Sequence, residues 1–296
     1  MKNLLTILLL LPLFCCAQGP QIPKRVGMLP PGIEESSGLE TAGNDQFYTH
    51  NDGNGEINLY KLDKYGAMTE YITIENVKVK DIEDIARDRK GNLYLGDFGN
   101  NDCDRKKFKI LKVALPEGAF AFPVATEIKF TLPDNTTDNH PKYDRNFDME
   151  AMFHHKGWIY IFSKDRSEPA KGYTKFYKVP DEEGTFTATY LGKIGTNMDR
   201  GKGVITAADI SPSGESIALL AKEGIYYISN YSSDEFHLGM KEFIPFTFKS
   251  QKEALVFTDD CNVLITDEMK DKNGARIYEL DVCTELFKLR EEKLKK

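Results

Sequence analysis

The chain has 296 residues, and 41% of them are hydrophobic, which is enough to bury a substantial core. Its formal net charge of −7 repels phosphate backbones and anionic lipid, so the composition argues against a nucleic-acid-binding protein. The acidic balance slightly favours a cation or a cationic substrate as ligand, and it equally serves solubility.

The N-terminal segment has the layout of a secretory signal peptide. A short basic start precedes an apolar run from Leu4 to Phe14, which is too short to span a bilayer as a stable helix. We predict a signal peptide over residues 1–17, cleavage before Gln18 and a single domain over residues 18–296. Alternatively, the segment resembles a degenerate lipoprotein cleavage site, with the lipid anchor on Cys16. Either route predicts an exported protein that is periplasmic, extracellular or anchored to the outer membrane, without a transmembrane segment.

The rest of the chain predicts an all-β protein. Short runs rich in Tyr, Phe, Ile, Val and Thr alternate with clusters of Gly, Asn, Asp and Pro, as around residues 92–96, 158–162 and 224–228. Only the charged C-terminal stretch from Glu285 to Lys296 is helix-like, and as a terminal segment we expect it to fray or to dock loosely.

A short motif recurs along the chain, and an apolar strand follows each copy. The copies are Ser37-Gly38-Leu39, Glu83-Asp84-Ile85, Glu150-Ala151-Met152, Ala208-Asp209-Ile210 and Glu253-Ala254-Leu255. Four strands in each repeat of roughly 45 residues is the pattern of a β-propeller. We therefore predict a β-propeller with one blade for each copy of the motif.

The repeat count predicts five blades. The segment from Lys24 to Leu29 precedes the first copy and supplies the strand that the last repeat lacks, which closes the ring and removes an exposed sheet edge. A sixth blade in the long interval between the second and third copies is the alternative. The stretch from Pro133 to Asn146 in that interval is more typical of a surface insertion.

The cysteines predict one disulfide. Export implies an oxidising compartment, in which disulfides persist. Cys261 and Cys283 flank two predicted strands, Asn262–Thr266 and Arg276–Asp281, and a hairpin of these strands brings the two cysteines face to face. We predict a Cys261–Cys283 bridge, which leaves Cys103 as an odd thiol. No CxxC motif or Cys/His cluster supports a zinc site.

Seven short segments carry a family resemblance, and they are residues 36–39, 50–52, 82–86, 93–101, 146–152, 205–211 and 251–255. Together they are similar to the SdiA-regulated, phytase-like group of exported bacterial propellers. The resemblance implies a funnel-shaped channel, frequent calcium binding and, in some branches, phosphoesterase activity. No single repeat of this chain carries a cluster of several acidic residues, which argues against a phytase-type site with several calcium ions.

The repeat also predicts the residues that face the channel. The innermost strand of each blade lines the centre of a propeller, so residues at one repeat position form a ring. The predicted ring consists of Ser37, Glu83, Glu150, Ala208 and Glu253. Its three carboxylates repel one another unless a cation binds or one of them is protonated. Oxygen ligands suit calcium, so Glu83, Glu150 and Glu253 are the predicted metal ligands.

A second predicted ring stands fourteen positions after the first, and we interpret both rings as lining a ligand-binding channel. It consists of Asn51, Asp97, Lys164, Lys222 and Asp267, with His50 and Asp52 nearby. The alternative interpretation is structural. In that case the lysines pair with the carboxylates, or the acids bind backbone amides of the neighbouring blade.

These patterns predict an exported propeller that binds calcium or a small ligand in its central channel, without catalysis of its own. The sequence has neither a G-x-S-x-G elbow nor a GxxxxGK[ST] phosphate loop. One alternative is a metal-dependent hydrolase of phosphoesters or lactones, because carboxylates and lysines share the channel. The other alternative is a protein-interaction scaffold that uses the blade faces.

Overall fold

The computed structural model describes residues 21–115, 123–270 and 272–295 of the chain. The predicted signal peptide and the predicted lipid anchor at Cys16 lie outside these residues. The first ten strands are β1 (Lys24–Met28), β2 (Ser36–Gly43), β3 (Gln46–Asn51), β4 (Gly53–Asp63), β5 (Met68–Arg87), β6 (Leu93–Asp97), β7 (Phe108–Ala114), β8 (Val124–Thr131), β9 (Asp148–His155) and β10 (Trp158–Lys164).

The C-terminal half continues the same alternation of short strands and turns. Its strands are β11 (Tyr173–Pro180), β12 (Gly184–Thr187), β13 (Thr189–Gly195), β14 (Ile205–Ile210), β15 (Ser216–Ala221), β16 (Gly224–Ser229), β17 (Met240–Pro245), β18 (Lys252–Phe257), β19 (Asn262–Asp267) and β20 (Arg276–Asp281). The helices are η1 (Lys142–Asp144), α1 (Arg200–Gly203), η2 (Phe236–Leu238) and α2 (Val282–Leu294). The predicted all-β class is confirmed.

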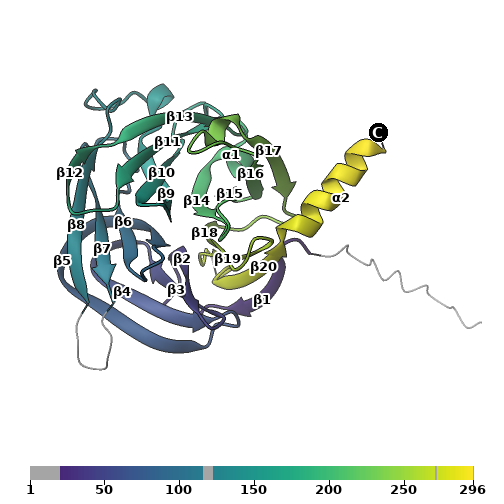
Figure 1. The fold of residues 1–296 in the computed structure, drawn as a ribbon, viewed down its shortest axis with the longest axis horizontal. Helices are drawn as coiled ribbons and strands as arrows, with labels where there is room; N and C mark the ends of the chain where they lie inside the picture. The colour runs from purple at the N-terminus through teal and green to yellow at the C-terminus, as the bar shows by residue number, and fades with distance from the viewer. Residues whose placement is uncertain (1–20, 116–122, 271, 296) are drawn as a thin grey trace, which may run out of the picture.

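The strands form antiparallel sheets that are arranged around a common centre (Figure 1). Three sheets have four strands each, in the orders β1-β20-β19-β18, β13-β11-β10-β9 and β14-β15-β16-β17. The remaining strands make one sheet in the order β12-β8-β7-β6-β5-β4-β3-β2. The long strand β5 joins its two parts, because Met68 to Ile82 pairs with β4 and Ile82 to Arg87 pairs with β6.

Five strands lie innermost and contact one another in a cycle. β2 lies beside β5, β5 beside β9, β9 beside β14, β14 beside β18, and β18 again beside β2 (Figure 1). Both faces of these strands are covered by neighbouring sheets, which is why nearly every residue of β9 and β18 is buried. In β2, β9, β14 and β18 the N-terminal part, and in β5 the start of the segment paired with β6, lie at the same end of the molecule, so side chains from these parts share one site.

Apolar side chains fill the spaces between neighbouring sheets. Phe108 of β7 packs in one cluster with Met152 of β9, and the next cluster joins β9 and β10 to β15. Further clusters join β15 to β18 and β18 to β2, as with Val256 and Leu39. This layered burial is the main source of stability, at about 25 cal/mol for each Å² of apolar surface removed from water.

The two ends of the described chain share one sheet. β1 pairs antiparallel with β20, with Lys24 opposite Glu279 and Met28 opposite Arg276. The short strand β12 links two neighbouring sheets. β12 crosses to the neighbouring sheet and pairs in parallel with β8, while β13 stays with β11, so β12 covers an edge that β8 otherwise exposes.

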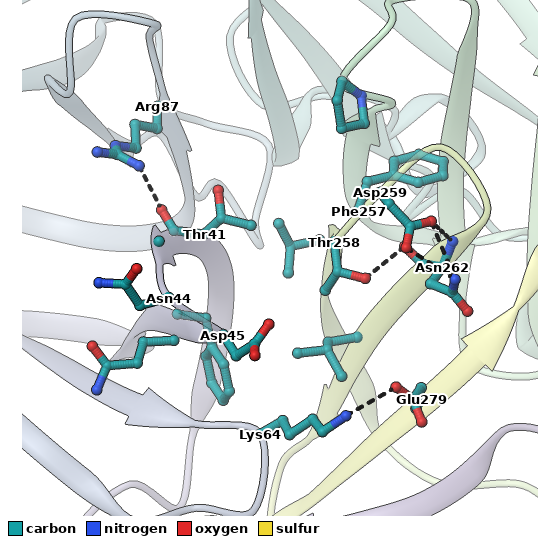
Figure 2. A pocket seen from close by; sticks show the side chains of 16 residues that line it. Thr41, Asn44, Asp45, Lys64, Arg87, Phe257, Thr258, Asp259, Asn262 and Glu279 are labelled. Atoms are coloured by element: carbon teal, nitrogen blue, oxygen red, sulfur yellow. Dashed lines mark hydrogen bonds and ion pairs between the residues drawn. The ribbon is translucent and has the colours of Figure 1, made fainter.

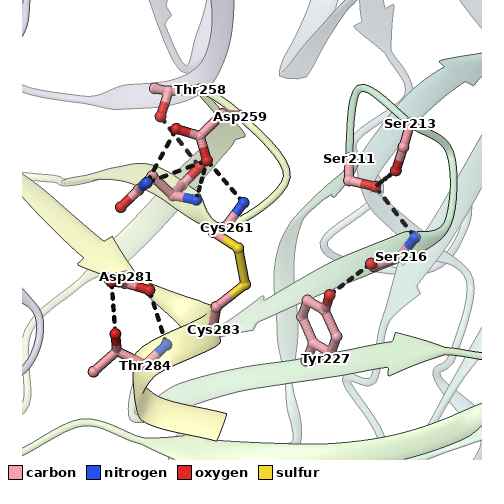
Figure 3. Close-up of a disulfide and its surroundings, with 11 residues drawn as sticks. Ser211, Ser213, Ser216, Tyr227, Thr258, Asp259, Cys261, Asp281, Cys283 and Thr284 are labelled. Carbon is pink, nitrogen blue, oxygen red and sulfur yellow. Dashed lines mark hydrogen bonds between the residues drawn. A yellow bond between two sulfur atoms is a disulfide. The ribbon is translucent and has the colours of Figure 1, made fainter. Parts of the chain in front are cut away.

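The predicted disulfide is confirmed. Cys261 and Cys283 are bonded with their Cα atoms 5.1 Å apart, at the end of the β19–β20 hairpin (Figure 3). Cys103 is the free cysteine of the described chain, and it is buried. The C-terminal helix α2 begins next to the bridge, where the Asp281 side chain accepts a hydrogen bond from the Thr284 amide at 2.8 Å.

Helix α2 extends away from the sheets (Figure 1). It begins three residues before the predicted Glu285 because Asp281 caps it. In the described part of the chain no helix has the length and apolar character needed to cross a membrane.

Candidate functional site

A pairing irregularity recurs near the N-terminal end of the inner strands. In β2, β9 and β18 it leaves Ser37, Glu150 and Glu253 without a partner in the next strand. In β5 the ladder to β6 shifts around Glu83, which stands at the same level. A β-bulge re-aims the side chain of its extra residue. These irregularities therefore bring four of the predicted ring residues to one level of the centre.

The fourth repeat differs from the prediction. Its irregularity falls at Thr206 of β14, two residues before Ala208. The sequence motif Ala208-Asp209-Ile210 matches Glu83-Asp84-Ile85 in its hydrogen bonding, because Asp209 and Asp84 each accept a bond from the amide that follows them. The motif is displaced by two residues along its strand, so Thr206 replaces Ala208 in the ring. The Thr206 hydroxyl donates to the Lys252 carbonyl at 2.9 Å.

The second predicted ring separates into two sets that point in different directions. Lys164 and Lys222 point toward the ring carboxylates, whereas three members bond to their own sheet. The Asp267 carboxylate accepts bonds from the Arg276 amide and the Tyr278 hydroxyl, at 2.8 and 2.7 Å. Asp97 and Asn51 likewise bind neighbouring backbone groups and Arg105.

The separation has a simple physical reason. Adjacent residues of a strand point to opposite sides, and a bulge changes the count by one. Lys164 and Lys222 follow directly after the residues that pair across the bulge, Ser163 and Ala221. The residues at the matching position in the first and last repeats are therefore Asp52 and Glu268, not Asn51 and Asp267. Asp52 was among the predicted channel residues, whereas Glu268 was not.

Lysines neutralise one half of the site. Lys164 Nζ lies 2.8 Å from a Glu150 oxygen and 3.7 Å from a Glu253 oxygen, and Lys222 Nζ lies 3.5 Å from Glu253. Burial raises the pKa of Glu150, but the ammonium of Lys164 together with other nearby groups outweighs burial, so that the pKa lies below its ordinary value. Glu253 joins none of the groups of three carboxylates found among the described residues. Of the three predicted metal ligands, Glu253 is therefore placed with the lysines.

Carboxylates gather in the other half of the site, around Glu83. This residue belongs to two groups whose oxygens lie within 4.8 Å of one another. One group is Glu83 with Asp52 and Asp81, and the other is Glu83 with Asp148 and Glu150. The acids come from three inner regions of the fold, which is how a cluster forms although no single repeat contains one.

Besides Glu268, three members of the site were not predicted from the sequence. Asp81 precedes Glu83 by two residues, and Asp148 precedes Glu150 by two residues. Residues two apart share one side of a strand, so the repeated Asp-x-Glu spacing is a signal that identifies both. Arg166 lies beyond the end of β10, with Nε 2.5 Å from Asp148 and Nη2 2.9 Å from Glu150. No comparable spacing signals this arginine.

A glycine permits the close approach of the loop after β6. A Cβ atom on Gly99 would lie 2.2 Å from Glu83 Oε1 and 2.4 Å from Asp81 Oδ2, which is closer than atoms can approach. The Gly99 amide donates to the Asp81 carbonyl at 3.2 Å. The backbone thus lies directly against the carboxylates, and any larger residue would displace them.

Burial and mutual repulsion raise the pKa values of the unpaired carboxylates. Burial, followed by the charges of Glu150 and Asp52, raises the pKa of Glu83 well above its ordinary value. Burial raises the pKa of Asp52 to about 7, with a further contribution from Asp81. Burial and the Glu253 charge raise the pKa of Glu268 to about 7. The charged form of these carboxylates is therefore only partly compensated, chiefly by Lys164.

Two buried oxygens of the site have no hydrogen-bond donor within the described chain. One is Oδ1 of Asp52, and the other is Oε1 of Glu253, which forms a long ion pair of 3.5 Å with Lys222 but no hydrogen bond. Leaving a buried acceptor unpaired costs about 1–3 kcal/mol, and more for a charged group. The hydrogen bonds within the protein thus leave the site incomplete, and a bound cation would complete it.

Two cavities connect the carboxylates with solvent. One has a volume of about 640 Å³ and is lined by Asp81, the loop from Gly99 to Asn101 and basic side chains that include Arg105 and Lys106. The other has a volume of about 240 Å³ and is lined by His50, Asp52 and Glu56. A small ion can therefore reach Asp52 and Asp81, two members of the first carboxylate group, without unfolding the ring.

Comparisons with known proteins support the fold class. A quinone-bound (PQQ) aldose sugar dehydrogenase from Streptomyces coelicolor matches with a TM-score of 0.51 at 9% identity, over 87% of this chain and 96% of that chain. A structure described as a gluconolactonase matches with a TM-score of 0.46 at 11% identity, over 84% of this chain and 74% of that one. The WD40 propeller domain of Doa1 matches with a TM-score of 0.41 at 10% identity, over 88% and 70%.

The likeness to the dehydrogenase fold and the cycle of inner strands define the chain as a β-propeller. No family model matches the sequence, and no curated protein matches it. The resemblance to the SdiA-regulated group therefore stays a prediction. What the fold and the site define together is a β-propeller whose centre holds more carboxylates than neighbouring cations.

Proposed function

We propose that the protein is an exported propeller that binds calcium in its central channel, without catalysis of its own. The observation that carries the proposal is the double carboxylate group around Glu83, because its five carboxylates outnumber the neighbouring Lys164 and Arg166. Calcium takes six to eight oxygen ligands in a flexible arrangement, which suits carboxylates that come from separate strands. In this proposal Asp52, Asp81, Glu83 and Asp148 supply ligand oxygens, and Glu150 is shared with Lys164.

Thermal unfolding tests the proposal. A ligand that binds only the folded state stabilises it by about 2.7 kcal/mol at one hundred times its dissociation constant. We expect excess calcium to raise the melting temperature relative to excess chelator, and Glu83→Gln to abolish the rise. Glu70→Gln, which removes an exposed carboxylate paired with Lys61, is the matched control and keeps the rise. An equal melting temperature with calcium and with chelator would refute the calcium site.

One observation favours a hydrolase as the second candidate. The cavity beside Asp81 is lined by Lys80, Arg105 and Lys106, so a cation held by the carboxylates would share a cavity with basic side chains. A cation next to lysine and arginine suits an anionic substrate such as a phosphoester. Calcium-dependent turnover of p-nitrophenyl phosphate that Glu83→Gln abolishes in a folded protein would favour this candidate over the non-catalytic one.

We further propose five blades closed by the N-terminal strand. The support is the five-membered cycle of inner strands, the change of partners within β5 and the pairing of β1 with β20. Deleting residues 21–29 removes β1 and should lower the melting temperature while leaving the other sheets folded. A β1 deletion that melts at the temperature of the intact protein would contradict closure by this strand.

We also propose export with removal of residues 1–17. The Cys261–Cys283 disulfide supports an oxidising compartment. Mass spectrometry of the protein recovered from cells distinguishes the two routes of processing. A mature chain that begins at Gln18 indicates ordinary secretion, whereas a lipid-modified Cys16 indicates a membrane anchor. A chain that retains Met1 in the cytoplasm would contradict export.

A further inference from the structure

A separate cavity opens at the other end of the inner strands (Figure 2). Its volume is about 630 Å³, and it lies between the β2–β3 hairpin on one side and the β18–β19 hairpin on the other. Arg87 at the end of β5 and Pro212 after β14 complete its rim. The carboxylate groups around Glu83 belong to the opposite ends of the same strands, so this cavity is distinct from the proposed calcium site.

Part of the cavity wall is fixed by bonds within the protein. The Asp259 carboxylate accepts bonds from the amides of Cys261 and Asn262, both at 2.8 Å, and from the Asn262 side chain. Lys64 Nζ lies 3.5 Å from Glu279 on the facing sheet. Asp259, Lys64 and Glu279 therefore have partners within the protein. They form part of the cavity wall but do not determine which charge a ligand must carry.

Other polar groups of the cavity have no partner within the described chain. The side chains of Asn44 and Asp45 make no hydrogen bond there, and the Asp45 carboxylate points toward the facing wall (Figure 2). Both residues have positive φ angles, 53° and 57°, in the tight β2–β3 turn that presents them. Arg87 Nη1 donates to the Thr41 carbonyl at 3.1 Å, whereas its buried Nε has no acceptor.

A smaller cavity of about 260 Å³ adjoins the first and shares Thr41, Arg87, Pro212 and Phe257 with it. Its lining includes Glu40, whose Oε1 accepts bonds from the Thr41 amide and hydroxyl at 2.7 and 2.9 Å. The two cavities thus share the Arg87 side chain, with Asp45 lining the first cavity and Glu40 lining the second.

This set of groups selects a neutral ligand with many hydroxyls. An anion would meet Asp45 and Glu40, and a cation would meet Arg87. A hydroxyl both donates and accepts, so several hydroxyls on one ring satisfy the carboxylates and the guanidinium together. The apolar residues Pro212 and Phe257 offer a wall for the carbon-bound face of such a ring. The volume lies within the usual range of small-molecule sites, roughly 300–1,000 Å³.

We propose that this end of the channel binds a neutral sugar, held by Asp45 and Glu40 as acceptors and by Arg87 as donor. The site does not depend on the proposed calcium site, because no carboxylate of the Glu83 groups lines either cavity. Failure of one proposal therefore leaves the other standing.

Isothermal titration calorimetry tests the proposal, with the purified protein in excess chelator. The probes are D-glucose, D-galactose, N-acetyl-D-glucosamine, maltose and cellobiose, with L-glutamate, spermidine and inorganic phosphate as charged comparators. We expect at least one neutral sugar to bind with a dissociation constant below about 1 mM, which corresponds to roughly 4 kcal/mol. We expect the charged comparators not to bind.

Two variants and one control locate the site. Asp45→Asn keeps a residue that tolerates positive φ, so the turn is preserved while the charged acceptor is lost. We expect it and Arg87→Met each to weaken sugar binding by about tenfold or more, as loss of a charge-assisted hydrogen bond does. Glu215→Gln, on a neighbouring turn outside both cavities, leaves the affinity unchanged.

Three results would overturn the proposal. They are an absence of binding by every neutral sugar of the panel, binding of the charged comparators alone, and sugar binding that both Asp45→Asn and Arg87→Met leave unchanged. Asp45→Asn by itself keeps the test decisive if Arg87→Met fails to fold.

Discussion

The buried lysine of the acidic centre provides the sharpest test of the electrostatic reasoning. Lys164 is 8% exposed, and its ammonium lies 2.8 Å from Glu150 and 3.7 Å from Glu253. Lys164→Met keeps most of the apolar stem and removes the charge, which leaves two buried carboxylates with less compensation. Removing one partner of a buried pair costs about 3–5 kcal/mol, so we expect the free energy of unfolding to fall by that amount at pH 7.5.

Urea denaturation in excess chelator measures the effect, and Lys288→Met is the matched control. Lys288 forms an equally short pair with Glu285 at 2.6 Å, but its side chain is 55% exposed, so its loss should cost less than about 1 kcal/mol. At pH 5 the deficit of Lys164→Met should shrink, because protonation removes the uncompensated charge of Glu150. A cost no larger than that of Lys288→Met, or a deficit independent of pH, would refute the pairing described here.

Three further predictions concern the centre and the disulfide. The pKa values of Asp52 and Glu268 are both raised to about 7, so the folded state holds more protons than the unfolded state between pH 4 and 7. In excess chelator, the free energy of unfolding should therefore fall as the pH rises through 7. Calcium should reduce that fall, which a series of denaturation curves at different pH values measures. Gly99→Ala should weaken calcium binding by about tenfold or more in calorimetry, because its Cβ displaces the carboxylates beneath it; unchanged affinity would contradict the placement of that loop. Replacing Cys261 and Cys283 by serine should cost about 3 kcal/mol in urea, since the bridge closes a loop with a sequence separation of 22, and a cost near zero would show that the hairpin is held by other contacts.

The all-β class and the disulfide were predictable because both depend on short-range patterns. The alternation of apolar strands and turns is visible in the local sequence without information about neighbouring sheets. The β19–β20 hairpin brings Cys261 and Cys283 together. The repeat also placed Glu150 and Glu253 at the N-terminal parts of β9 and β18, and Glu83 at the start of the segment of β5 that pairs with β6. Their burial and separation required the structure, because which carboxylate meets which cation depends on neighbouring sheets.

The errors of detail share one physical cause, which is that a bulge shifts the direction of side chains by one residue. A prediction from fixed spacing in the sequence does not account for that shift. It placed Ala208 where Thr206 stands, and it grouped Asp267 with Lys164, although Glu268 is the residue at the matching position. Arg166 reaches the site from a loop, where no periodicity constrains direction.

The distribution of charge within the centre separates the structural interpretation from the ligand-binding one. If the acids served only to hold the sheets together, each buried carboxylate would have a protein partner, as Glu150 and Glu253 have in the lysines. Around Glu83 two groups of carboxylates gather instead, and burial with the charges of Glu150 and Asp52 raises its pKa more than Lys164 lowers it. A cluster that its own protein compensates only in part costs stability in every state without a ligand. The lysine half of the centre thus accounts for stability, and the Glu83 half is the part that a calcium ion would complete.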